Sequence, residues 1–146
     1  MLALDGEGLR LVAGGTGSTR LIPFETPEAQ VLATLQPLRG APTERATNEE
    51  CGAGPLSFAD WSDDFQLVFQ EGRFVGWSTD ERGLTTMSGV GVGSTRAELL
   101  GAYAADIGES TLGTEFSAGG LGGLLSGPGA AARVTTIWAG TICAFR

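Results

Sequence analysis

The sequence predicts an α+β fold of two related halves that share one core, each half a short helix plus a roughly three-stranded antiparallel meander. A stretch that begins at Phe24 recurs, with similar residue types, from Val92. Each copy has helical spacing of apolar residues and reaches a glycine, Gly40 in the first copy and Gly108 in the second. The 24 glycines and the runs of alternating apolar and polar residues indicate turns and strands elsewhere.

The first half covers residues 1–79 and opens with a hairpin over residues 2–13. Thr26 is the expected N-cap of the first helix, with Pro27 at its first position. Pro37 is expected to end this helix about one residue earlier, since proline cannot donate a hydrogen bond to the preceding turn. Residues 40–55 are rich in turn formers and are expected to be irregular. Three strands follow in the predicted meander: residues 56–61, 65–70 and 73–79.

The second half covers residues 80–146. Thr95 and Glu98 have the spacing of a capping box, which predicts where the second helix begins. Its apolar stripe continues through Tyr103 and Ile107, and Gly108 is expected to close it. Strand patterns complete this half: residues 114–118, 124–125 and 133–139.

Composition excludes several classes of function. The formal net charge is −8, and all nine basic residues are arginine. No basic patch for a nucleic acid is visible. Histidine and lysine are absent, which removes the usual general base, the commonest zinc ligand and the Schiff-base nucleophile. We therefore expect neither a metal site nor a cofactor. The absence of these groups favours a non-catalytic protein over an enzyme.

The two cysteines, Cys51 and Cys143, are expected to form a disulfide with each other. The alternative is a pair of buried free thiols. A disulfide implies an oxidising compartment, so we expect a periplasmic, cell-envelope or secreted location. The residues that follow Met1 do not have the pattern of a signal peptide, so we expect that the leader of this protein has been removed. A run long enough to span a membrane is also missing.

Both halves have a helix that begins after a cap residue and reaches a glycine, followed by a meander whose hairpin turns at a glycine. The residues of this pattern are Phe24, Thr26, Pro27, Val31, Gly40 and Pro42 in the first half, and Val90 to Ser94, Leu99 and Gly108 in the second. The pattern resembles a known extracytoplasmic module. It is similar to the module of the small outer-membrane assembly lipoproteins, the SmpA/OmlA (BamE-like) group. Two such modules in tandem resemble the β-lactamase inhibitory protein group. The resemblance implies a scaffold used for protein contacts.

The sequence favours a non-catalytic extracytoplasmic protein, secreted or lipid-anchored, whose function is to bind another protein through a sheet face. The candidate contact residues are Trp61, Trp77 and Trp138, which lie on predicted strands, and Asp63 beside the first of them. Aromatic side chains dominate the energetics of protein interfaces, although burial in the core is the alternative for each tryptophan.

Two other functions stay open. Asp60, Asp63, Asp64 and Glu25 could serve a carboxylate-dependent hydrolase, because paired carboxylates can divide the acid and base roles. For the three aspartates, a solvated acidic turn between two strands is the favoured explanation, because turns favour aspartate for local hydrogen bonds to the backbone. The third possibility is a small-ligand carrier, which requires an apolar cavity.

Overall fold

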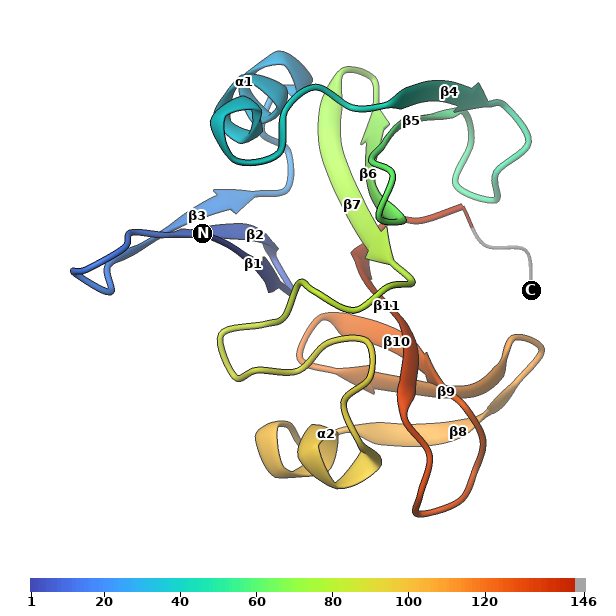
Figure 1. Ribbon diagram of the computed structural model, residues 1–146. Coiled ribbons are helices and arrows are strands. Elements are labelled where there is room, and N and C mark those ends of the chain that lie inside the picture. The colour runs from blue at the N-terminus through green and yellow to red at the C-terminus, as the bar shows by residue number, and fades with distance from the viewer. Residues whose placement is uncertain (144–146) are drawn as a thin grey trace.

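The computed structural model describes residues 1–143 and has an α+β architecture of two helices and mostly antiparallel sheets (Figure 1). The helices are α1 (Glu28–Arg39) and α2 (Arg96–Ala102). The strands are β1 (Leu2–Asp5), β2 (Gly8–Val12), β3 (Thr19–Pro23), β4 (Glu44–Asn48), β5 (Leu56–Asp60), β6 (Phe65–Gln70), β7 (Arg73–Thr79), β8 (Asp106–Ser110), β9 (Gly113–Ala118), β10 (Leu121–Leu125) and β11 (Val134–Gly140).

The first three strands form a small antiparallel sheet in the order β1-β2-β3, and its first two strands confirm the predicted hairpin. This sheet packs against the larger one through a tryptophan of β7. The Trp77 indole N–H donates to the backbone oxygens of Asp5 and Gly8, at 3.1 and 2.7 Å. A buried indole needs such a partner, so these bonds place the β1–β2 turn on the large sheet.

The large sheet has eight antiparallel strands in the order β4-β5-β6-β7-β11-β10-β9-β8. Strands β4 to β7 form one meander and β8 to β11 form another, and the two meet where β7 pairs with β11. The predicted meanders had about three strands, so β4 and β8 are additional. Residues 40–55 were expected to be irregular, but they contain β4. This strand lies at an edge of the sheet with all five residues exposed, so it lacks the apolar alternation that marks a half-buried strand.

Helix α1 corrects two expectations. Thr26 is not its N-cap, because the Thr26 hydroxyl donates to the Pro23 oxygen while Pro27 occupies the cap position. The helix also continues through Pro37 to Arg39. Val31 and Leu35, on the side of the helix that packs into the core, are fully buried. Packing of these side chains offsets the hydrogen bond that proline cannot donate.

Helix α2 begins as predicted, because Thr95 and Glu98 form the capping box. The Thr95 hydroxyl accepts from the Glu98 N–H at 3.1 Å, and the Glu98 carboxylate accepts from the Thr95 N–H at 2.9 Å. The helix ends earlier than expected, at Ala102, because Tyr103 is extended. Ile107 and Gly108 belong to β8 instead, where Ile107 pairs with Phe116 of β9.

The main core lies between the large sheet and the layer formed by both helices and the small sheet (Figure 1). Its central residues follow the strand register across one face of the large sheet. Residues paired across antiparallel strands project from the same face, so they form a continuous buried row. That row is Ala59, Leu67, Trp77, Ala139, Leu121 and Ala118. We call this side the inner face and the opposite side the outer face.

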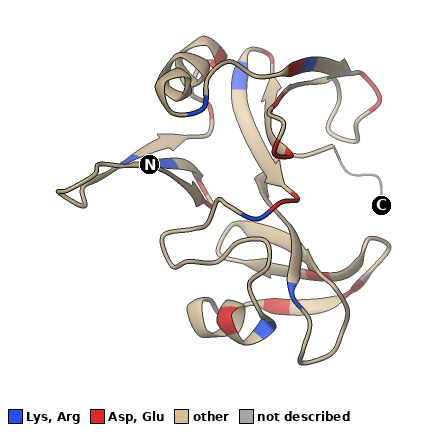
Figure 2. Ribbon diagram, viewed as in Figure 1, with Lys and Arg blue, Asp and Glu red and all other residues tan. Residues whose placement is uncertain are grey.

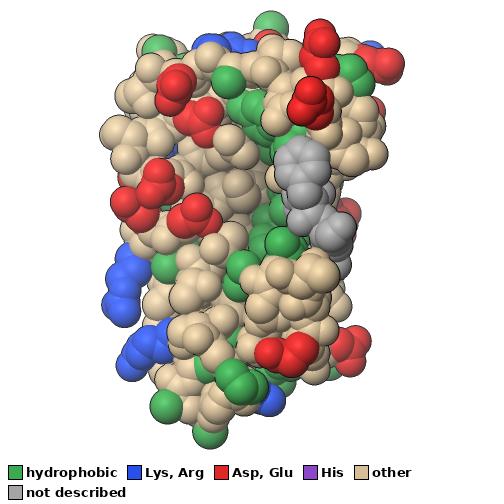
Figure 3. Space-filling model, turned by 90° about the vertical axis from the view of Figure 1, so that its right-hand side faces the viewer, with side chains coloured by type: hydrophobic (Ala, Val, Ile, Leu, Met, Phe, Trp, Pro, Cys, Tyr) green, Lys and Arg blue, Asp and Glu red, His purple; other side chains and the backbone are tan. Residues whose placement is uncertain are grey.

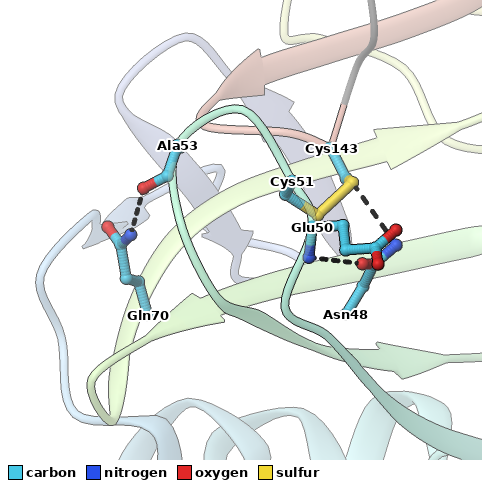
Figure 4. Close-up of a disulfide and its surroundings, with 6 residues drawn as sticks. All are labelled: Asn48, Glu50, Cys51, Ala53, Gln70 and Cys143. Atoms are coloured by element: carbon cyan, nitrogen blue, oxygen red, sulfur yellow. Dashed lines mark hydrogen bonds between the residues drawn. A yellow bond between two sulfur atoms is a disulfide. The ribbon is translucent and has the colours of Figure 1, made fainter.

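The expected disulfide joins Cys51 to Cys143 (Figure 4). It fastens the loop after β4 to the segment that follows β11. The loop is also held by the side-chain amide of Gln70, which donates to the Ala53 oxygen at 2.9 Å. Such a bond is compatible with an extracytoplasmic location. Of the helices formed by residues 1–143, none has both the length and the apolar character that a membrane crossing requires.

Candidate functional site

The candidate site is the outer face of the large sheet, which Figure 3 shows directly. One row of residues crosses all eight strands on this face, each paired with the next in the strand register. We call it the cross-sheet row. It consists of Glu44, Asp60, Gln66, Ser78, Trp138, Gly122, Ser117 and Asp106. Polar and acidic side chains therefore project from the outer face, next along each strand to the residues of the buried inner row.

An acidic hollow of about 330 Å³ lies over the first meander. Four carboxylates contribute to its lining, and the amide of Gln66 donates to one of them, Asp60, at 2.8 Å. A carboxylate is a hydrogen-bond acceptor when ionised, so this hollow favours donors and cations. We define the acidic hollow by Glu44, Asp60, Asp64, Gln66, Ser78 and Asp80.

A second hollow, of about 420 Å³, lies over the other meander. A Cβ atom added to Gly122 would approach the Trp138 indole nitrogen to 2.4 Å, so the absence of a side chain there lets the indole lie against β10. Trp138 is only 9% exposed as a result. We call this the glycine hollow and define it by Asp106, Glu115, Ser117, Gly120, Gly122 and Trp138.

Negative charge is concentrated at the end of the acidic hollow. The pKa of Glu81 is raised above its ordinary value of 4.5, first by the charge of Asp64, then by desolvation, a hydrogen bond with Asp64 and the charge of Asp63. Asp63 itself pairs with an arginine, because both of its oxygens accept from Arg39 Nη2, at 2.5 and 2.6 Å. Figure 3 shows acidic side chains in several separate groups on this face and basic side chains mainly toward its margins.

The three tryptophans named from the sequence do not come together on an exposed surface. Trp77 is fully buried on the inner face, and Trp61 is 6% exposed with its N–H donating to the Arg39 oxygen at 3.1 Å. Trp138 alone lies in the cross-sheet row. Asp63, the fourth candidate, makes its ion pair at the end of α1.

The fold brings two of the four carboxylates of the hydrolase alternative into one hollow and places the other two outside it. Asp60 and Asp64 line the acidic hollow, and Asp63 is paired with arginine. Glu25 lies before the first residue of α1, whereas Asp63 contacts its last residue. A helix of 12 residues is about 18 Å long, so Glu25 is far from the three aspartates. Among residues 1–143, no group of three or more His, Cys, Asp or Glu side chains is placed to hold a metal ion.

For the carrier alternative, the relevant feature is a pair of adjoining hollows, about 380 and 340 Å³ in volume, beside the N-terminus. Both hollows contain Met1 and Leu38 in their linings, and Met87 lines the larger one. These three side chains are 73%, 45% and 55% exposed. The hollows are therefore depressions at the surface, in contrast to the enclosed cavity that a carrier of a hydrophobic ligand uses.

Most of the cross-sheet row was not identified from the sequence. Gln66, Ser78, Ser117 and Asp106 are scattered along the chain and have no common motif. They come together only through strand register, which one sequence read alone does not reveal. Gly122 did carry a signal, since a glycine inside a strand often marks the close approach of another group.

Comparisons of the chain with protein-family models, with curated proteins and with solved structures found no match. The resemblance to the lipoprotein and inhibitor modules therefore gains no support from relatives.

Proposed function

We propose that the protein is a non-catalytic extracytoplasmic protein, secreted or lipid-anchored, that binds another protein through the outer face of its large sheet. The cross-sheet row is the observation that carries this proposal. It spans eight strands, and at about 4.8 Å per strand its length is about 34 Å. A surface of that length matches the dimensions of a standard protein interface better than those of a small-molecule pocket.

The character of the row also supports binding. At its centre, the neighbours of Trp138 on either side are Gly122 and Ser78, which have little or no side chain. Polar groups surround Trp138, of which only 9% is exposed, so contacts with a partner fall mainly on the polar and acidic side chains of the row. The disulfide and the resemblance to extracytoplasmic modules support the location.

The two meanders, each with its helix, are part of the same proposal. We regard them as related modules, residues 1–79 and 80–146. Each helix precedes four antiparallel strands, and the strands occupy mirrored positions, β4 and β8 at the edges and β7 and β11 at the centre. Superposing residues 28–79 on 96–140 tests this idea. Related modules bring α1 onto α2 as well as strand onto strand, and helices left far apart would contradict the relation.

Capture of a partner from the envelope of the source cells tests the binding function. The immobilised wild type is compared with Ser78→Leu, which places a bulky neutral side chain in the middle of the row. Gln36→Leu, on the exposed side of α1, is the matched control. We expect the control to retain what the wild type retains and Ser78→Leu to lose about tenfold or more. Equal retention by both variants would refute the proposal, as would a wild type that retains nothing.

A further inference from the structure

The outer face has an uneven charge that defines the chemistry of its partner. Of the residues on the strands of the large sheet, only Arg45 and Arg73 are basic. Blue segments are sparse along the whole ribbon in Figure 2. Arg45 lies on the inner face, where it pairs with Glu28 of α1 at 3.1 Å. Arg73 is the first residue of β7, and its guanidinium donates to the backbone oxygen of Glu25. The cross-sheet row therefore has carboxylates and no arginine.

These carboxylates are available to a partner. Within the described part of the chain, none of Glu44, Asp60, Asp64, Asp80 and Asp106 forms an ion pair with an arginine. An incoming cation would therefore displace no existing pair. The elevated pKa of the neighbouring Glu81 reflects the same crowding of negative charge.

The two hollows lie at a spacing that an extended peptide can match. Gln66 on β6 lies in the acidic hollow, and Ser117 on β9 lies in the glycine hollow. From β6 to β9 the sheet order crosses four strand spacings, which is about 19 Å. An extended chain advances about 3.3 Å per residue, so about six residues separate the hollows. Residues i and i+6 of such a chain project from the same side.

We infer that the partner contributes an extended cationic segment that lies along the cross-sheet row, with an arginine or lysine in each hollow and six residues from the first to the second. This inference rests on the proposed function and specifies the partner's chemistry. Ser78 of the acidic hollow and Trp138 of the glycine hollow are neighbours in the row, so they contact the middle of the segment. Carboxylates attract guanidinium and ammonium groups, and a partly enclosed hollow screens that attraction less than open water does.

A pair of synthetic peptides tests the spacing. The first, GRSGSGSRG, has arginines at i and i+6. The second, GGSRGSRSG, has the same residues with the arginines at i and i+3, which project from opposite sides. Each is titrated into ¹⁵N-labelled protein at low salt, and amide shifts are followed. We expect shifts at both hollows for the first peptide, an affinity at least about threefold above that of the second, and weaker binding at higher salt.

Variants separate a specific site from general attraction to an acidic protein. Asp60→Asn removes a charge from the acidic hollow and Asp106→Asn removes one from the glycine hollow. Glu7→Gln, in the exposed β1–β2 turn, is the control with the same change in net charge. We expect each hollow variant to weaken the first peptide about two- to fivefold and Glu7→Gln to leave it unchanged.

Three results would overturn the inference. Equal affinity for the two peptides would reject the spacing, and equal loss with Glu7→Gln would reject the site. Failure of both peptides to bind would reject a cationic partner. None of these results decides the proposed function. That function is tested by capture of a partner with Ser78→Leu, a substitution that changes no charge.

Discussion

Removing the disulfide should destabilise the protein substantially. The double variant Cys51→Ser, Cys143→Ser opens a covalent loop whose ends are 92 residues apart. In the chain-entropy treatment, closing a loop of that length lowers the entropy of the unfolded chain enough to be worth about 4–5 kcal/mol. We therefore expect the free energy of unfolding to fall by about that amount.

Urea unfolding, followed by tryptophan fluorescence, measures this difference. For a chain of this size the same loss corresponds to about 10–20 °C in the midpoint of thermal unfolding. Wild-type protein in reductant is the control, and it should behave like the double variant. The slope of the urea transition should increase, since an open unfolded chain exposes more surface. A loss below about 1 kcal/mol would refute the reasoning, because it would mean that the unfolded chain keeps these ends together without the bond.

Two other predictions concern the outer face. Gly122→Ala should displace the Trp138 indole and lower the free energy of unfolding in urea by about 1–3 kcal/mol. The control is Gly108→Ala, whose new Cβ meets no atom within 4 Å and which should change that free energy by about 0.5 kcal/mol or less. Equal effects of the two variants would contradict this. Asp64→Asn should lower the pKa of Glu81 toward 4.5 in an NMR titration. Because the folded state raises that pKa, the wild type loses stability as pH rises through it, and the variant should lose less.

Features set by local sequence signals were predicted correctly. The hairpin over residues 2–13 is defined by a turn and two short apolar runs, and the Thr95–Glu98 capping box lies within one turn of helix. The disulfide was predictable for a different reason. With only Cys51 and Cys143 in the chain, an intramolecular bond has a single possible pairing.

Features set by tertiary contacts were not predictable in the same way. Pro37 was expected to stop α1, but the burial of Val31 and Leu35 outweighs the lost hydrogen bond. The strand β4 has no apolar pattern because it is an exposed edge. The cross-sheet row depends on the register of seven strand pairs, and a shift of one residue in any pair would move its side chains to the other face.

The pairing of β7 with β11 has a consequence for how the chain folds. Every other neighbouring pair in the large sheet joins consecutive strands, whereas this one brings residues 76–79 to residues 137–140. Closing so long a loop costs chain entropy that a short hairpin does not. The two meanders should therefore assemble early and independently, and their junction should limit the folding rate. Substitutions along that junction should slow refolding, while those in the outer hairpins should mainly speed unfolding.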